Sequence, residues 1–580
     1  MTSAISTVLM AGGLDLVEPY LTIPKGKLID ALNYECRPRG GYRRINGYTL
    51  YDGSDTAAAV AGEGVVRGVW VYNGDIYAFR DQTSVGGMFK AGVTGWVQQT
   101  FNPVLHYNTG TRIFAEGTTV TGVTSTATGV IRRVVYSTGL TDQGNVTGLL
   151  VLSGVTGTFQ AAENLQVGGV TYAKAVAAQA TYTLPKGGSY RFRNHNFYGQ
   201  ADTKRMYGVN GVGVAFEWDG TYFVPIEDGS GAVYPTQLEI HKSSLHLMYD
   251  KGSDIVSAVG NPLSFNVLEG ATEIAVGDTI ESTKAMTGGT LAIGCRDSIQ
   301  VLYGDDADTY QIQQYAARGI RADTMREISG LTMFLDDNGL ESVQAAASYG
   351  DFSGNTISSS VNPRLIRDNT YAGDAVAVAC RTKGQYRIFF GQVGWYFCFE
   401  GTKFVGATPV TYNNSVLCAC SGEDDNDKEV LFFGSSDGNV FKMDDGYNFN
   451  GTAITAYLKF PFNSESNPTQ RKHFRDMRTY VEVEGAQPIL NYRADFDFNL
   501  GVSQSSDIIP LMTQGANGSA WDEGFWDTFY FADETPNEAY ARIDGTGQNL
   551  SITIYSAGTE AGTHTIYSNI FRYSFRRQMR

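Results

Sequence analysis

The sequence predicts an all-β protein built around a β-propeller, and three observations support this prediction. Glycine is abundant, with 68 of 580 residues, and aromatic residues reach 12 % while charged residues make up only 18 %. No stretch keeps an apolar 3.6-residue period over several turns, as amphipathic helices would require. A hairpin at residues 330–343 recurs along the chain at a spacing that suits propeller blades.

The hairpin at 330–343 combines two apolar runs with an acidic turn. Residues Leu331 to Leu335 lead into Asn338-Gly339, and the second run leaves through Leu340 and Val343. Asn-Gly between two such runs predicts a tight primed turn, which needs positive φ at its central residues. Copies are expected at 69–79, 215–223, 291–301 and 430–441, with weaker ones at 245–256 and at 386–399, turning near Val393-Gly394.

The spacing of these turns predicts the number of blades. Turn glycines stand at 74, 220, 252, 339, 394 and 438, and Asp297 marks a further turn, so the steps from 252 onward are 45, 42, 55 and 44 residues. A four-stranded blade needs about 40–45 residues. Seven hairpins therefore predict six to eight blades. The alternative, a large β-sandwich with many tight turns, gives no reason for this period.

Four regions follow from composition. Residues 1–64 read as an extended N-terminal arm, broken by Pro19, Pro24 and Pro38, and the propeller takes 65–103 and 185–451. Residues 104–184, rich in Thr, Gly, Val and Ala, predict an inserted small β-domain, either an adhesin module or a passive spacer. Residues 452–580 predict a C-terminal β-sandwich-like domain. Its basic end, 571–580, is expected to be an edge strand that pairs with a neighbouring subunit or is protected by its charges.

The charge balance excludes a protein that grips nucleic acid. There are 44 Lys and Arg against 60 Asp and Glu, giving a net charge of −16, whereas phosphate neutralisation needs clustered cations. The acidity would repel DNA or simply maintain solubility. Four arginines near the N-terminus, Arg37, Arg39, Arg43 and Arg44, form either an interchain salt-bridge patch or a solvated loop.

Several features argue against a membrane span, export or thiol chemistry. No apolar run of about 18 residues is present, so no membrane span is expected. The N-terminus lacks the basic and apolar regions of a secretory signal, which favours synthesis in a reducing cytoplasm. No C-x-x-C pair supports a zinc or redox site; the cysteines are Cys36, Cys295, Cys380, Cys398, Cys418 and Cys420.

Segments that match catalytic or calcium-binding sequence motifs have simpler explanations. Residues 434–438 match G-x-S-x-G, but the following residues read as a returning strand, where a nucleophile elbow needs a helix. The acidic runs at 423–429 and 304–308 lack the glycine and glutamate of a calcium loop, so they are expected to be inter-strand loops.

The histidines also lack the spacing of metal ligands. His241 and His246, five residues apart, would face opposite sides of a regular strand, and the remaining histidines are scattered: His106, His195, His473 and His564. The aromatic loop from Trp521 to Trp526 is either a sugar-stacking site or sandwich core. No catalytic, cofactor or metal residues are predicted, and no cofactor.

Many of these segments together resemble the tail nozzle family, also called tail tubular protein B, of short-tailed bacteriophages. The resemblance covers nearly all of the chain outside the insert and rests on hairpin-rich motifs. The segments that carry it are 12–16, 31–33, 43–47, 196–199, 207–211, 216–220, 260–263, 298–304, 334–337, 385–390 and 430–443.

The resemblance implies a structural subunit and not an enzyme. A homohexameric ring below the head-to-tail adaptor would enclose the DNA channel, retain the genome and open for ejection. Tail fibres or spikes would bind outside, double-stranded DNA would pass without specific binding, and assembly in the host cytoplasm would place the protein in the virion tail. The residues that line the channel are not predicted. The alternatives are a receptor- or glycan-binding adhesin and a polysaccharide-degrading propeller enzyme.

Overall fold

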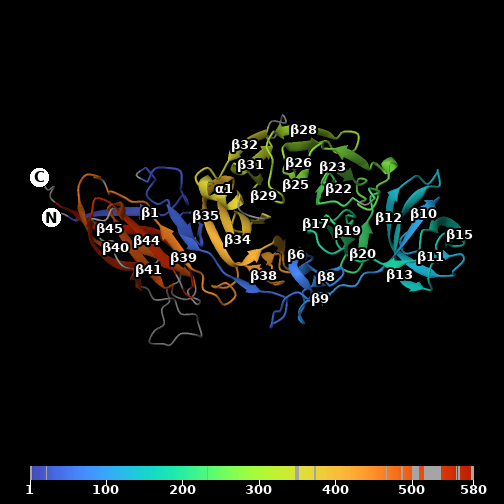
Figure 1. The fold of residues 1–580 in the computed structure, drawn as a ribbon, viewed down its shortest axis with the longest axis horizontal. Coiled ribbons are helices and arrows are strands. Elements are labelled where there is room, and N and C mark those ends of the chain that lie inside the picture. Colours follow the sequence, from blue (N-terminus) through green and yellow to red (C-terminus); the bar gives the residue numbers. More distant parts are fainter. Residues whose placement is uncertain are drawn as a thin grey trace.

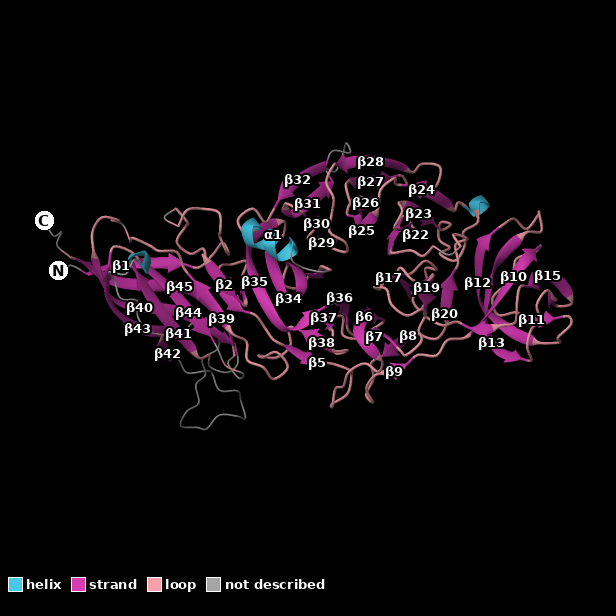
Figure 2. Ribbon diagram, in the orientation of Figure 1, coloured by secondary structure: helices cyan, strands magenta, loops and turns pink. Residues whose placement is uncertain are grey.

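The computed structural model describes residues 3–576, except 21, 232, 346–351, 371–373, 466, 485–487, 500–507, 515–536, 557 and 559–561. The molecule is elongated, with a C-terminal β-domain at one end, a propeller in the middle and the inserted domain at the other end (Figure 1). Both chain ends lie at the far side of the C-terminal domain. Strands dominate all three bodies (Figure 2).

Seven antiparallel sheets form the propeller, within the predicted range of six to eight blades. The first four blades each take four consecutive strands. Blade 1 comprises β6 (Glu63–Tyr72), β7 (Asp75–Asp81), β8 (Gly86–Lys90) and β9 (Val97–Gln98); blade 2 comprises β17 (Arg191–His195), β18 (Arg205–Val209), β19 (Ala215–Trp218) and β20 (Phe223–Ile226). Blade 3 comprises β21 (Gln237–His241), β22 (Ser244–Tyr249), β23 (Ser253–Val256) and β24 (Thr272–Ala275); blade 4 comprises β25 (Ile280–Met286), β26 (Thr290–Cys295), β27 (Ile299–Tyr303) and β28 (Gln311–Ala316).

The last three blades close the ring. Blade 5 comprises β29 (Arg326–Ile328), β30 (Leu331–Asp336), β31 (Gly339–Ala345) and β32 (Phe352–Thr356); blade 6 comprises β33 (Val376–Cys380), β34 (Gln385–Glu400) and β35 (Lys403–Val416). Blade 7 comprises β36 (Cys418–Glu423), β37 (Glu429–Gly434) and β38 (Val440–Met443), and its fourth strand is β5 (Tyr48–Leu50) from the N-terminal segment. The first strand of every blade contacts the first strands of both neighbours, so the ring is complete.

Six of the seven predicted hairpins are present: those at 69–79, 215–223, 245–256, 291–301, 330–343 and 430–441. In the hairpin at 330–343, Asp336 pairs with Gly339, so the turn residues are Asp337 and Asn338 and only Gly339 has positive φ. The primed turn expected there occurs instead at Asn73-Gly74, where φ is 48° and 77°.

The prediction of a hairpin at 386–399 is wrong. These residues belong to the single 16-residue strand β34, which turns into β35 at Gly401. The glycines that suggested a turn serve other purposes. A register shift follows Gly391, whose φ is 67°, and a Cβ on Gly394 would lie 2.6 Å from the Phe389 ring. They therefore mark a β-bulge and a close contact.

The inserted domain is a seven-stranded antiparallel sheet that interrupts the chain between blades 1 and 2. Its strands are β10 (Pro103–Gly110), β11 (Thr119–Gly122), β12 (Thr128–Thr138), β13 (Val146–Thr156), β14 (Asn164–Val167), β15 (Val170–Ala175) and β16 (Ala180–Thr181). Because β13 pairs with β10 as well as β12, the sheet closes on itself around its own apolar core, which includes Leu105, Ile131 and Leu150.

The C-terminal domain combines late strands with the first strands of the chain. Its late strands are β39 (Ala456–Lys459), β40 (Lys472–Glu484), β41 (Leu490–Phe496), β42 (Ile509–Gln514), β43 (Asn537–Gly547), β44 (Leu550–Ser556) and β45 (Thr563–Phe575). The early ones are β1 (Ser3–Leu9), β2 (Asp30–Leu32), β3 (Tyr34–Cys36) and β4 (Tyr42–Arg44). β2 pairs with β39, and β1 and β4 pair with β45.

The N-terminal segment therefore binds two bodies instead of forming a separate core. Its buried side chains, including Leu14, Leu28, Tyr34 and Tyr42, share one apolar cluster with residues of blades 5 and 6 and of the C-terminal domain. The helix α1 (Asn362–Thr370) packs on the same cluster through Leu365. Two short 3₁₀ turns, η1 (Val267–Glu269) and η2 (Asp497–Asn499), complete the elements of the residues that the structure describes. No helix among the described residues is long and apolar enough to span a bilayer.

Candidate functional sites

The axis of the propeller is crossed by an ion pair. Arg191 on β17 places Nε 3.1 Å from Oδ1 of Asp323, which directly precedes β29. These residues belong to blades 2 and 5, which are three positions apart in a ring of seven and so as far apart as two blades can be. A direct contact between them therefore spans the centre of the ring.

Further charges extend this closure, and we call the set Arg191, Arg193, Glu239, Lys284, Asp323 and Arg326 the axial network. Arg193 binds both oxygens of Glu239 at 2.9 and 2.8 Å, and Lys284 lies 3.7 Å from the same carboxylate. Arg326 donates to Asp323 at 3.0 Å. Burial raises the pKa of Glu239, but Arg193 and Lys284 outweigh it and hold this pKa at about 2. The Glu239 carboxylate is therefore charged at neutral pH.

The axial network joins four successive blades across the propeller axis. It takes side chains from blades 2, 3, 4 and 5, and its ion pairs link each of these blades to another one of the set. Within blade 5, Arg326 adds a second cation beside Asp323.

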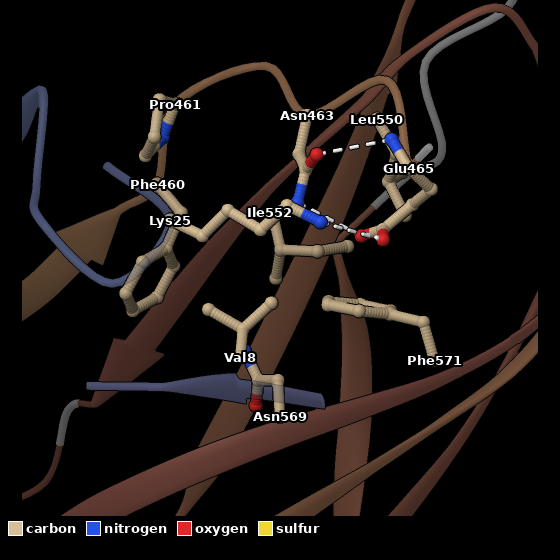
Figure 3. A pocket seen from close by; sticks show the side chains of 10 residues that line it. All are labelled: Val8, Lys25, Phe460, Pro461, Asn463, Glu465, Leu550, Ile552, Asn569 and Phe571. Carbon is tan, nitrogen blue, oxygen red and sulfur yellow. Dashed lines mark hydrogen bonds and ion pairs between the residues drawn. The ribbon is translucent and has the colours of Figure 1, made fainter. Parts of the chain in front are cut away.

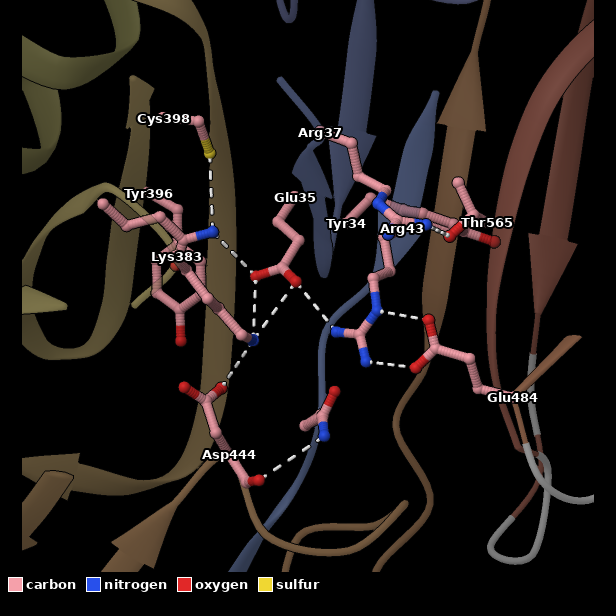
Figure 4. A network of polar contacts seen from close by, with 12 residues as sticks. Tyr34, Glu35, Arg37, Arg43, Lys383, Tyr396, Cys398, Asp444, Glu484 and Thr565 are labelled. Carbon is pink, nitrogen blue, oxygen red and sulfur yellow. Dashed lines mark hydrogen bonds and ion pairs between the residues drawn. The ribbon is translucent and has the colours of Figure 1, made fainter. Parts of the chain in front are cut away.

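A second cluster of charges joins the N-terminal segment, the propeller and the C-terminal domain (Figure 4). Its centre is Glu35 on β3, whose side chain is only 4 % exposed. It accepts from Arg43 at 2.9 Å, from Lys383 at 3.2 and 3.3 Å and from Gln385 at 2.9 Å. Arg43 continues to Glu484 on β40. We call this set the junction network.

The junction network also reaches blade 7. Lys383 lies 3.1 Å from Asp444, and Arg387, fully buried and 4.3 Å above the Tyr396 ring, donates to the same carboxylate at 2.7 Å. Burial raises the pKa of Asp444, yet Arg387 and Lys383 hold it well below its usual value. Three sections of the chain are thus tied together by charges that stay ionised.

The four-arginine cluster predicted from the sequence is mainly part of this junction. Arg37 pairs with Glu482 at 2.8 Å, Arg43 with Glu484 at 2.6 Å, and Arg44 is fully buried, with its Nη2 3.3 Å from the Tyr447 carbonyl. Arg39 is exposed. Neither expectation, an interchain patch or a solvated loop, holds for the other three. The carboxylates that pair with Arg37 and Arg43 come from a distant strand of the same chain, and Arg44 is buried against backbone carbonyls.

The predicted acidic loops behave as loops. In the loop between β36 and β37, Asp424 accepts from the amides of Asn426 and Lys428, and Glu429 accepts from those of Arg381 and Thr382. The loop borders a polar hollow of about 450 Å³ beside the turn of blade 1. At 304–308, Asp306 accepts from Thr309. Turn geometry accounts for both runs.

The serine motif at 434–438 lies between strands β37 and β38. Ser436 is exposed in this hairpin loop, and the chain continues as a strand, so the nucleophile-elbow geometry is not met. The aromatic loop from Trp521 to Trp526 lies outside the described residues.

The histidine prediction was wrong in one respect. His241 and His246 lie on different strands, β21 and β22, because Lys242 and Ser243 form a turn with positive φ between them. Their ring centroids are 5.9 Å apart. His246 pairs with Asp254 at 2.8 Å, and both side chains are fully buried. Within the described part of the chain, no group of three or more His, Cys, Asp or Glu side chains could hold a metal ion.

Further cavities lie outside the networks. One of about 20 Å³ lies within the C-terminal domain beside β1, lined by Val8, Ile552 and Phe571 and bordered by the ion pair Lys25–Glu465 at 3.0 Å (Figure 3). It has room for one water molecule at most.

A larger cavity, of about 620 Å³, separates the inserted domain from the loop between β20 and β21. Tyr234 and Asp228 line its propeller side, and His106 lines the insert side. His106 pairs with Glu227 at 2.8 Å, a contact that raises the pKa of His106. A Cβ on Gly229 would lie 2.4 Å from Thr138 of β12, so the two walls touch at this point.

Comparisons with known proteins give distant structural similarity alone. The sequence matches no protein-family model and no curated protein. The WD40 domain of coronin from Toxoplasma gondii is similar with a TM-score of 0.35 and 10 % identity, over 71 % of this chain and 87 % of that one. Virginiamycin B lyase from Staphylococcus aureus is similar with a TM-score of 0.32 and 8 % identity, over 58 % and 98 %. The assignment as an all-β chain with a seven-bladed propeller rests on the strand pairing described above.

Proposed function

We propose that the chain is a structural subunit of a short-tailed phage tail, assembling as a homohexameric nozzle ring that encloses the DNA channel, retains the genome and allows its ejection. The observation that carries the proposal is the path of the N-terminal segment. It adds β1–β4 to the C-terminal domain and β5 to blade 7, and the junction network locks the two bodies together. A subunit that bears pressure from packaged DNA needs such rigid coupling.

The axial network supports the same proposal from a second direction. Because Arg191 and Asp323 close the propeller axis, the propeller acts as a solid building block, and the channel is formed where several copies surround a common axis. A net charge of −16 suits a wall past which DNA slides, since a repelled phosphate backbone releases no counterions and gains no binding energy. Adaptor and fibre proteins would bind the ends and outside of this ring.

Negative-stain electron microscopy of the purified chain tests the proposal. We expect six-fold rings with an open centre, in which each propeller appears as a solid lobe. Sedimentation velocity should give the matching hexamer mass. A chain that stays monomeric up to concentrations of tens of micromolar, with and without a head-to-tail adaptor present, would overturn it.

A receptor- or glycan-binding role is favoured by one observation, the 620 Å³ cavity beside the insert. Its wall combines tyrosine rings with carboxylates, the mixture that holds saccharides through stacking and hydrogen bonds. Titration with host surface glycans, followed by calorimetry, tests this role. Saturable binding that Asp228→Asn abolishes would support this role. Equal binding heats for the unmodified chain and for Asp228→Asn would reject it.

A further inference from the structure

The C-terminal strand is not the edge that the sequence predicted. β45 has β40 on one side and β1 on the other, with Ser3 opposite Ser574 and Leu9 opposite Ser568. The one arginine of β45, Arg572, therefore does not protect an edge; it forms an ion pair with Asp476 of β40. Residues 577–580 lie outside the described part of the chain. Sequence reasoning missed the pairing with β1 because the covering strand comes from the opposite end of the chain. The edge strand on this side of the sheet is therefore β1.

The outer edge of β1 has none of the usual protection. Among the described strands, β1 pairs with β45 alone. Its sequence, Ser-Ala-Ile-Ser-Thr-Val-Leu, contains no charge, proline or glycine. Edge strands are normally blunted by lysine, proline or a bulge, because their free N–H and C=O groups can pair with another chain. Ile5 and Leu9 are also 69 % and 73 % exposed.

The edge is preformed and of useful length. Val8 and Met10 are buried on the inner side and hold β1 against the sheet. The free edge ends at Leu9, where the chain around Gly26 covers it. A Cβ added to Gly26 would lie 2.0 Å from the Leu9 carbonyl oxygen, and the Ala11 amide donates to the Gly26 carbonyl. Residues 3–8 remain free, which is about 20 Å of strand at roughly 3.4 Å per residue.

We infer that this free edge pairs with a strand of a second copy of the chain, which adds to the sheet across the subunit boundary. This inference rests on the proposed ring. β1 runs along the long axis of the molecule (Figure 1), so copies packed side by side bring it against a neighbour. Copies carrying −16 each repel one another, and an uncharged strand is where they approach at least cost.

The symmetry of a ring restricts the partner strand. Pairing of β1 with β1 about a two-fold axis would close after two copies, whereas a ring needs different surfaces on its two sides. In the ring, the neighbour therefore contributes a strand other than β1.

A matched pair of variants tests the inference. Ile5→Asp/Thr7→Asp adds two negative charges at exposed positions of β1, and Val170→Asp/Val176→Asp adds the same charge at exposed positions of the insert. Sedimentation velocity and electron microscopy are measured for both and for the unmodified chain. We expect the first variant to need at least tenfold more protein to assemble, and the second to assemble like the unmodified chain.

Hydrogen exchange of the unmodified chain gives a reading that does not depend on any variant. Peptides covering residues 3–9 should exchange more slowly in the assembled protein than after dilution to monomers. Equal exchange, or equal assembly of the two variants, would overturn the inference and leave the ring proposal standing. A closed dimer that the first variant dissociates would support the inference and overturn the ring. A monomeric unmodified chain would overturn both.

Discussion

Glu35→Gln is the sharpest test of the coupling between the propeller and the C-terminal domain. The substitution keeps the size of the side chain but removes the buried charge that faces Arg43 and Lys383, and it replaces one acceptor oxygen with an amide donor. Burial raises the pKa of Glu35, yet Lys383 and Arg43 hold it below its ordinary value, so the wild-type group is ionised at pH 7. The variant leaves two cations facing a neutral amide.

The magnitude follows from the geometry. Removing one partner of a buried ion pair costs about 3–5 kcal/mol, because the remaining charge stays desolvated. Here both cations keep another partner: Arg43 retains Glu484 at 2.6 Å and Lys383 retains Asp444 at 3.1 Å. We therefore expect a loss near the lower limit, about 3 kcal/mol, in the free energy of the unfolding transition that separates the two bodies.

Glu482→Gln is the matched control. It removes the same kind of charge from the same junction, but its ion pair with Arg37 is more open, with side chains 22 % and 37 % exposed. An exposed pair contributes up to about 1 kcal/mol. Urea unfolding at pH 7, followed by tryptophan fluorescence and by limited proteolysis between the domains, measures both variants. If Glu35→Gln loses no more stability than Glu482→Gln, the junction network does not couple the domains.

Three further predictions concern the closure of the ring and its pH dependence. Tyr48→Ala should cost about 3–5 kcal/mol of unfolding free energy because the buried ring packs on four aromatic neighbours. Tyr48→Phe keeps the ring and loses only the two hydrogen bonds with Asn414, so it should cost about 1–2 kcal/mol. Gly74→Ala should destabilise the fold more than Gly220→Ala in thermal scans: both have positive φ, but only at Gly74 would the Cβ strike a neighbour, the Asp425 carboxylate at 1.7 Å. Burial, aided by Arg44, lowers the pKa of His564 to about 3, so the unfolded chain binds the extra proton as pH falls below about 6.5. The unfolding free energy should then fall by up to about 1.4 kcal/mol per pH unit from this group, and His564→Gln should show a shallower slope in urea titrations at pH 5 to 7. The first prediction is contradicted if Tyr48→Ala loses no more stability than Tyr48→Phe, and the second if the two glycine variants lose the same stability. The third is contradicted if His564→Gln leaves the pH slope unchanged.

Local chemistry made the blades predictable from sequence. A tight turn requires particular residues within four positions, so Asn73-Gly74 or Asp336–Gly339 can be recognised without knowledge of the rest of the fold. The same rule failed at Gly394, because a bulge and a close contact with Phe389 also require glycine. A glycine thus shows that the backbone requires the absence of a side chain, but it does not show whether the reason is a turn, a bulge or a close contact.

Long-range pairing was not predictable in this way. The strand β5 is only three residues long, and its place beside β38 depends on the order in which all seven blades close. Likewise, no residue near Arg191 in the sequence shows that its partner is Asp323, more than a hundred residues away. The two residues meet only because the ring places blades 2 and 5 on opposite sides of the axis. The arginines at 37–44 were recognised as a cluster, but their partners on β40 could not be assigned.

The two networks and the free edge assign different mechanical roles to different parts of the chain. In the proposed ring, the axial network would hold blades 2 to 5 together across the propeller axis when force acts along the molecule. The junction network passes that force to the C-terminal domain through side chains that remain charged at neutral pH. There the sheet ends in β1, whose unpaired backbone groups form the kind of contact that can join one rigid subunit to the next. If the ring opens during ejection, the change should therefore occur between subunits, because within each subunit the charges that would have to separate are held in ion pairs and the central carboxylates Glu35 and Glu239 are buried.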